Sequence, residues 1–519
     1  MRSLLNFLAI LMFAAAPLAA AVDVRPAPTS VRVTPAAPKF TDAERQAELA
    51  RRRTAVAAKM ADNSMLVLFS AEPKLYTNDV NYVYRQENNL FYLTNLEQNG
   101  ATFVMLKQGG KTTEFVFIPK RDPRFETWNG KMYSNEQAAA ISGVKNISDA
   151  AERAAFLEAA KAKSAFASKD GSAKIDVFPE TVYMLLPNTD GDRGGRREYG
   201  NEFDYSKQLG AAYKVANARP IFNELRQIKS SYELAMLQHA IDITTEAQMR
   251  SWAMVGQATM EYEVQAEVEY TFRRRNADFW GYPSIVGCGP NATTLHYEEA
   301  QGQVKKGDLL LMDVGAEYEH YTADVTRTFP VSGKFSKEQA EIYQIVYDAQ
   351  EAAAKATKPS ATMRAVSDAA DVVIKDGLFR LGLITDKNSM QHKIWYMHGL
   401  GHYLGMNVHD VSALGLFAPG MTFTNEPGIY IREDALANLP DTPENKAFIE
   451  KVRPAFEKYK NIGVRIEDDM LVTAGGVQWM TKNLPRKLEE IEAFMASNGG
   501  RSAFLPFIAH PAASSRHAE

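Results

Sequence analysis

Cysteine is the least frequent residue type in this chain of 519 residues, because Cys288 is the only one. A single cysteine excludes any disulfide within the chain, so stability must come from size and a packed core. This fits an exported protein that lacks crosslinks. The formal net charge of -4 is small for this length. So small a charge argues against a nucleic-acid-binding surface.

Long hydrophobic runs are also lacking. Residues 4–16 are apolar but too short to span a bilayer comfortably, and no later stretch reaches transmembrane length without charges. Arg2 precedes that run and Ala19-Ala20-Ala21 follows it, which is the pattern of a signal peptide over residues 1–21. A buried first helix is the alternative. We expect export, to a periplasm or out of the cell, with residues 22–39 as a Pro- and Ala-rich linker.

The chain is too long for one compact core, so we expect two domains. Residues 40–220 alternate between predicted helices and short apolar strands, which indicates an α/β domain with a mixed sheet. The helices are predicted at 40–59, 135–141 and 150–160, and the strands at 66–70, 91–93, 102–106 and 113–118.

Residues 221–498 have the pattern of an antiparallel sheet covered by two pairs of helices, which makes the whole chain α+β. Helices are predicted at 230–255, 262–275, 336–356 and 362–381, with strands at 309–314, 321–329, 428–431 and 464–472. Ser336 and Gln339 form a capping box at the start of the third helix. Residues 499–519 are predicted to be a loose tail.

Five residues in this second half are candidate metal ligands: Asp313, Asp324, His402, Glu426 and Glu467. Four carboxylates and one imidazole are ligands that hard divalent cations prefer. A hairpin would bring Asp313 and Asp324 side by side, where they repel unless a cation lies between them. A solvated surface hairpin is the alternative, but the apolar residues around Asp313 disfavour it.

Three of the nine histidines, His398, His402 and His409, lie within the segment HGLGHYLGMNVHD. Its glycines disfavour a helix and favour a turn that brings imidazoles and backbone close to a ligand. His296, in NATTLHYEEA, is a fourth candidate, although alone it favours a structural role.

The two glutamates have different surroundings. Glu426 precedes Pro427-Gly428 and so should lie at a strand edge. Arg465 and Glu467 are two residues apart on a predicted strand and share a face, so Arg465 could orient the Glu467 carboxylate or form an ordinary ion pair with it. The acid run from Glu467 to Asp469 would by itself be a solvated edge.

These motifs resemble the pita-bread metallopeptidases, a group that includes aminopeptidase P and prolidase. The segments YRQENNLFYLTNL, RDPRFETWNGKM and RPIFNELRQIKSSYELAMLQHAI extend the resemblance through the first domain to the start of the second. Methionine aminopeptidase lacks that first domain, and creatinase lacks the metal ligands. The resemblance implies an N-terminal domain like that of aminopeptidase P and a C-terminal pita-bread catalytic domain.

The resemblance also implies roles for individual residues. Asp313 would bind one metal, Asp324 and Glu467 would bridge two metals, and His402 and Glu426 would complete the second site. The two divalent ions are expected to be Mn²⁺, with Zn²⁺ and Co²⁺ as alternatives. A hydroxide that bridges the metals would attack the peptide bond, with Glu426 moving its proton. His409 would stabilise the oxyanion, and His296, His398, Tyr430 and Arg465 would contact or support the substrate.

The implied activity is that of an Xaa-Pro aminopeptidase acting on peptides with proline in second position. An Xaa-Pro dipeptidase (prolidase) is the alternative, because the charged insert at residues 432–459 could cap the site and limit peptide length, or be a surface elaboration. A non-catalytic peptide-binding protein is a third hypothesis, and a serine hydrolase is disfavoured because no G-x-S-x-G motif is present. The family also implies a homodimer or homotetramer.

Overall fold

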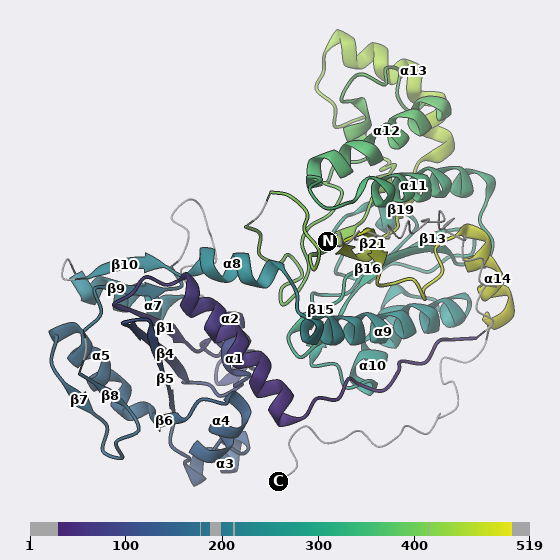
Figure 1. The fold of residues 1–519 in the computed structure, drawn as a ribbon. Coiled ribbons are helices and arrows are strands. Elements are labelled where there is room, and N and C mark those ends of the chain that lie inside the picture. The colour runs from purple at the N-terminus through teal and green to yellow at the C-terminus, as the bar shows by residue number, and fades with distance from the viewer. Residues whose placement is uncertain (1–29, 177, 187–198, 211–212, 414, 501–519) are drawn as a thin grey trace, which may run out of the picture.

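The computed structural model describes residues 30–176, 178–186, 199–210, 213–413 and 415–500. Two units, each a sheet covered by helices, lie next to each other (Figure 1). The predicted signal peptide lies outside the described residues, as does the predicted tail beyond residue 500. The predicted domain boundaries stay predictions.

The first unit is built on a six-stranded mixed sheet with the order β10-β9-β1-β4-β5-β6. β1 pairs antiparallel with β4 and parallel with β9, and β5 pairs parallel with β6. The mixed sheet predicted from the sequence is therefore confirmed. Its strands are β1 (Ser64–Phe69), β4 (Thr102–Gln108), β5 (Lys111–Ile118), β6 (Asn146–Asp149), β9 (Thr181–Met184) and β10 (Lys214–Asn217).

Helices cover both faces of this sheet. Alternate residues of β1 point to opposite faces: Leu66 packs in a core with α1 and α2, and Val67 packs in a second core with α5 and α7. The helices are α1 (Asp42–Lys59), α2 (Asn88–Thr94), α3 (Pro123–Asn129), α4 (Asn135–Ser142), α5 (Arg153–Ala162) and α7 (Gly200–Leu209). Two short hairpins complete the unit, β2 (Leu75–Thr77) with β3 (Val80–Asn81) and β7 (Phe166–Ala167) with β8 (Lys174–Ile175).

One predicted strand of this unit is wrong. Residues 91–93 lie within the helix α2 and not in the sheet. The Glu87 side chain caps this helix by accepting a hydrogen bond from the Leu90 amide, and Asn95 ends it in the left-handed conformation at φ 53°. Cap residues therefore outweighed the aromatic β-propensity of the run Phe91-Tyr92.

The second unit places its strands between two pairs of helices, as predicted (Figure 1). The pairs are α9 (Ser231–Met254) with α10 (Glu261–Arg274), and α11 (Lys337–Ala356) with α12 (Met363–Leu381). The capping box of Ser336 and Gln339 begins α11, as the sequence indicated. Three further helices are α8 (Arg219–Gln227), α13 (Pro443–Tyr459) and α14 (Leu488–Asn498).

The strands of the second unit form short antiparallel ladders. They are β11 (Phe279–Trp280), β12 (Ile285–Cys288), β13 (Leu309–Val314), β14 (Ala316–Tyr318), β15 (Tyr321–Thr322), β16 (Val325–Pro330), β17 (Thr422–Asn425), β18 (Gly428–Tyr430), β19 (Gly463–Arg465), β20 (Asp468–Thr473) and β21 (Gly476–Trp479). Two strands predicted as continuous are interrupted, one at Asp324 and the other at Glu467. The ladder stops at the acids themselves.

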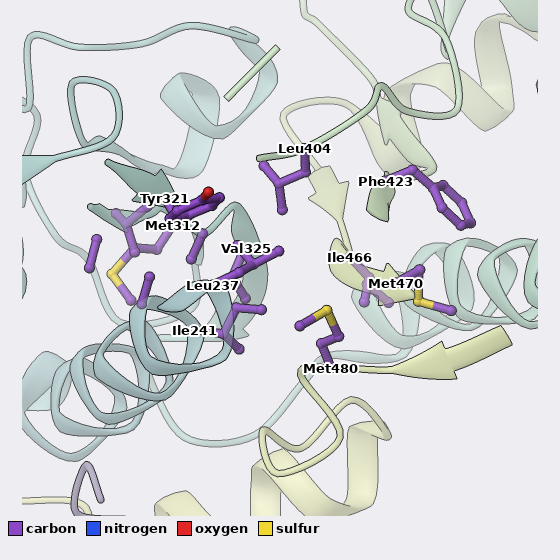
Figure 2. Close-up of a cluster of buried hydrophobic side chains, with 14 of the residues drawn as sticks. Leu237, Ile241, Met312, Tyr321, Val325, Leu404, Phe423, Ile466, Met470 and Met480 are labelled. Atoms are coloured by element: carbon purple, nitrogen blue, oxygen red, sulfur yellow. The ribbon is translucent and has the colours of Figure 1, made fainter. Parts of the chain in front are cut away.

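One hydrophobic core joins the two units. It runs from residues of α1 and α2 through α9 to the strands and helices of the second unit. Figure 2 shows part of it, where Leu237 and Ile241 of α9 lie near Met312 and Val325 of the central strands. No helix within the described residues has the length and apolar character needed to cross a membrane.

Candidate metal centre and peptide cleft

Asp313 and Asp324 converge on the hydroxyl of Tyr282. The Tyr282 oxygen lies 2.5 Å from Asp313 Oδ1 and 2.6 Å from Asp324 Oδ1. Asp313 is in β13, where it pairs with Thr326 of β16, and Asp324 immediately precedes β16. The predicted hairpin therefore does place the two carboxylates together, although β14 and β15 extend its turn.

Glu467 and Arg465 reach the same centre from the other ladder. The Thr326 hydroxyl donates to Glu467 Oε2 at 2.6 Å and accepts from Arg465 Nε at 3.1 Å. Arg465 Nη2 donates to Asp313 Oδ2 at 2.6 Å. Arg465 therefore orients Asp313 directly, and it reaches Glu467 through the hydroxyl of Thr326.

His402 completes the group from a loop. Its Nε2 lies 3.2 Å from Asp324 Oδ2 and 3.4 Å from Glu426 Oε1. One ligand atom each from Asp324, His402 and Glu467 can be found within 4.8 Å of one another, a spacing that suits a metal ion. The loop can approach because Gly401 has no side chain: a Cβ there would lie 2.0 Å from the carbonyl oxygen of Thr424.

His398 and Tyr430 form a chain of hydrogen bonds behind the carboxylates. Arg465 Nη1 donates to the Tyr430 hydroxyl, which lies 2.8 Å from His398 Nε2, while His398 Nδ1 lies 2.7 Å from the Gly399 carbonyl oxygen. The carbonyl can only accept, so Nδ1 carries the proton and Nε2 accepts from Tyr430. Burial, and then the charge of Arg465, lower the pKa of His398 to about 3. His398 is therefore neutral, with both ring nitrogens bonded to the protein.

A cleft of about 290 Å³ opens onto these groups. His296 and His409 line it, and their side chains form no hydrogen bond with the described residues. The His409 ring meets the His402 ring edge to face at 4.3 Å. The cleft is lined by Tyr282, Pro283, Ile285, Leu295, His296, Glu298, Asp313, Asp324, His398, Gly399, Gly401, His402, Val408, His409, Glu426, Arg465 and Glu467. It thus offers two free imidazoles, an apolar wall and a cluster of acids.

The acids are short of positive charge. Burial and the neighbouring carboxylates raise the pKa of Asp324 and raise that of Glu467 well above its usual range. Burial raises the pKa of Glu426 to about 7, although His402 opposes the shift. Burial alone would lower the pKa of His402, but Asp324 and Glu426 outweigh it and raise this pKa to about 9.

The position of Tyr282 also indicates that the acids are short of positive charge. Its hydroxyl has one proton, yet it lies within hydrogen-bond distance of two carboxylates. The second contact needs either a proton on a carboxyl group or a cation beside it. The donor set, rich in oxygen with one imidazole, fits hard divalent ions.

All the predicted site residues come together in one place, but sequence reasoning missed several partners. Tyr282 and Thr326 connect the predicted ligands, and Asp469 accepts a hydrogen bond from the Asp324 amide at 3.2 Å. The Gly-Tyr-Pro triplet at 281–283, before an apolar strand, was the available signal for Tyr282. The acid run is not the solvated edge that it would be by itself: Asp468 and Asp469 are fully buried, and Asp468 pairs with Arg327 at 2.6 Å.

The insert at residues 432–459 contributes no side chain to the cleft wall. Its helix α13 packs through Phe448, Val452 and Phe456 into the core, and none of its residues lines the cleft. The capping role that the sequence left open is therefore not what the structure shows, whereas a surface elaboration agrees with it.

Comparisons with known proteins agree with this arrangement. Residues 235–474 match the model of metallopeptidase family M24, and residues 49–166 match that of the aminopeptidase P N-terminal domain. The chain is 34% identical to an Xaa-Pro aminopeptidase of Haemophilus influenzae over 458 residues, which is 86% of this chain and 97% of the relative. It is 32% identical to that of Escherichia coli over 473 residues, or 87% and 98%.

Solved structures of aminopeptidase P are similar to this chain as well. The Escherichia coli aminopeptidase P with the inhibitor Pro-Leu superposes with a TM-score of 0.74 at 30% identity, covering 89% of this chain and 99% of that one. A putative aminopeptidase P from Bacillus anthracis gives a TM-score of 0.75 at 28% identity, covering 88% and 100%.

Proposed function

Because the chain belongs to metallopeptidase family M24, with the N-terminal domain of aminopeptidase P, we propose that it is an Xaa-Pro aminopeptidase. It removes the first residue of a peptide when proline is second. The observation that carries this is the convergence of Asp313, Asp324, His402, Glu426 and Glu467 on one end of the cleft.

Divalent metal ions belong to this family's chemistry, and the same five side chains would hold them. When bound, such ions polarise the scissile carbonyl group and acidify water. We propose two Mn²⁺ ions, because one imidazole among four carboxylates is a harder donor set than zinc usually takes.

The chain's own residues supply the remaining steps. Glu426 Oε1 accepts from the Thr424 hydroxyl at 3.0 Å, which leaves Oε2 to take and return the proton of the attacking water. His409, on the cleft wall beside His402, can donate to the oxyanion. His296 can contact the substrate through its free nitrogens, whereas His398 offers its ring edge because both nitrogens are bonded.

The acids also select the end of the peptide. A free amino group placed near them is stabilised by their negative charge, which favours an exopeptidase. The position of α13 outside the cleft supports an aminopeptidase rather than a dipeptidase, since no insert residue lines the cleft.

Two further proposals concern export and assembly. The pattern of residues 1–21 supports export to a periplasm or out of the cell. Membership of the family supports assembly into a homodimer or homotetramer. N-terminal sequencing of the mature protein and light scattering of the purified protein test them.

A paired assay tests the activity. The Mn²⁺-loaded protein is given an Xaa-Pro-Yaa tripeptide, an Xaa-Pro dipeptide, and an Xaa-Ala-Yaa tripeptide as control. We expect cleavage of the first and little of the third. Cleavage of the dipeptide alone would identify a dipeptidase, and no cleavage with full metal loading would leave a binding protein.

A further inference from the structure

The segment between the two cleft histidines is held by residues far away in the sequence. We call residues 402–410 the histidine loop, since His402 begins it and His409 lies near its end. It contains no helix and only a single bridging pair to β17, from Tyr403 to Phe423. Backbone hydrogen bonds with β17 hold its first residues, and the Asp410 amide donates to the Tyr403 carbonyl oxygen at 2.8 Å.

A buried ion-pair cluster also holds the end of the loop, through the Asp410 side chain. Asp410 Oδ1 accepts from Arg226 Nη2 at 2.7 Å, and its Oδ2 accepts from Lys229 Nζ at 3.1 Å. The three side chains are at most 3% exposed. Burial alone would raise the pKa of Asp410, but the two cations outweigh it and lower this pKa. The cluster fits closely, because a Cβ on Gly405 would lie 2.2 Å from Asp410 Oδ2.

The same cluster connects the loop to the first unit. Arg226 lies on α8, which joins the two units (Figure 1), and its Nη1 donates to Asn89 of α2 at 2.8 Å. Arg85 Nη2 and Asn88 Nδ2 both donate to the Met406 carbonyl oxygen, at 2.9 and 3.3 Å. The first unit thus contacts the loop directly, although no described residue before Tyr282 lines the cleft.

His409 depends on this support. Its imidazole forms no hydrogen bond with the described residues, so its position follows from its packing on the His402 ring and from the backbone, where the next residue is Asp410. A displacement of about 1 Å at a catalytic group can cost about 100-fold in rate.

We propose that Asp410 is a positioning residue: its buried pairs with Arg226 and Lys229 set the histidine loop so that His409 faces the scissile bond. Through this cluster the first unit, whose described residues do not line the cleft, controls the chemistry. The inference rests on the proposed function, since it assigns a task to His409 in that reaction.

Asp410→Asn is the direct variant, since it keeps the shape and removes the charge. It leaves two buried cations without their anion, so a loss of stability is expected as well. Lys229→Met is the second variant: it keeps the aliphatic stem and the pair between Arg226 and Asp410, so the net charge of the cluster falls rather than rises.

The test is a double-mutant cycle with His409→Ala on an Xaa-Pro-Yaa substrate. We expect Asp410→Asn to lower kcat about 10- to 100-fold with KM changed less than about threefold, and Lys229→Met to do the same more weakly. When His409 is already alanine, adding Asp410→Asn should lower kcat by less than about twofold. Losses that multiply in full would show that Asp410 does not act through His409, and so would an unchanged kcat in both single variants.

Glu246→Gln is the matched control. Glu246 pairs with Arg275 at 2.5 Å, with side chains 2% and 6% exposed, and neither residue lines the cleft. This variant should lose stability but keep kcat. A comparable loss of kcat in Glu246→Gln would mean that any lost buried pair lowers activity, and the proposal would be wrong.

Hydrogen exchange separates this inference from the proposed function. Asp410→Asn should speed amide exchange in residues 402–410 with little change at β13, whatever the substrate. If the wild-type protein cleaves no Xaa-Pro peptide, the proposed function fails while faster exchange confined to the loop still supports the positioning. Unchanged exchange in the loop would overturn it.

Discussion

The carboxylates and the histidines of this site are held in different ways. The acids lie in or directly beside antiparallel ladders: Asp313 in β13, Asp324 before β16, and Glu426 and Glu467 in the breaks that follow β17 and β19. His402 and His409 lie on a loop whose close packing needs Gly401 and Gly405 and whose end is held by ion pairs from another part of the chain. The contribution of the four acids to metal binding should therefore be as robust as the fold, while the contributions of His402 and His409 can be lost through distant contacts.

The largest effect is expected for an acid held beside the β-ladders. Asp324→Asn removes one of the converging negative charges, so we expect lost metal binding and a fall in kcat of at least about 1,000-fold, with the fold retained. Metal content by mass spectrometry and far-UV circular dichroism check this. Full activity with full metal content would contradict any role for Asp324 as a ligand.

The second prediction concerns the metal-free protein. The folded-state pKa values of Glu426 and His402, about 7 and about 9, exceed their ordinary values of 4.5 and 6.5. Both groups therefore give stability at low pH that is lost as pH rises through the folded values. For Glu426 this is on the order of 3 kcal/mol.

Thermal unfolding between pH 5 and about pH 9 measures this effect. We expect the Tm of the chelated protein to fall as pH rises, and the Mn²⁺-loaded protein to show a much flatter profile. A chelated protein that gains stability over this range would show that the acids are not short of positive charge.

Tyr282 helps to hold two of the ladder-bound acids, Asp313 and Asp324, although it is not itself a proposed ligand. Tyr282→Phe removes the hydroxyl between Asp313 and Asp324. A loss of about 10- to 100-fold in metal affinity or activity is expected, as for other partners of ligating groups. Titration with Mn²⁺ followed by a rate measurement at saturation separates the two, and an affinity and rate equal to those of the wild type would refute the role.

The smallest effect is predicted for the insert. Lys446→Ala on α13 breaks only an exposed pair with Asp441, so we expect no more than about 0.5 kcal/mol in stability and no change in the ratio of tripeptide to dipeptide cleavage. A changed ratio would mean that the insert reaches the substrate and would add a third region to the comparison.

The sequence predicted most of what regular patterns control. The long helices, the mixed sheet and the two pairs of helices around antiparallel strands follow from periodicity and capping, as at Ser336. The five candidate ligands do converge; Asp313 was conspicuous as an acid among apolar residues, and His402 as one of three histidines in a glycine-rich segment.

What could not be predicted depends on contacts between distant segments. The breaks at Asp324 and Glu467 arise where one chain segment leaves its ladder for another. The helix at Asn88–Thr94 is a different case, because its caps Glu87 and Asn95 are local signals that the aromatic run concealed. The pairs that Asp410 forms join residues more than 180 positions apart, which no local pattern contains. Tyr282 was missed for the same reason, since only the fold places its hydroxyl between two acids.

The single hydrophobic core that passes from α1 and α2 through α9 has a consequence for modularity. Units that share a core in this way unfold together, whereas units joined by a linker melt one by one. The first unit is therefore not an accessory that can be exchanged or removed freely. A chimaera with a foreign first unit would have to reproduce the shared core before it could reproduce the reaction.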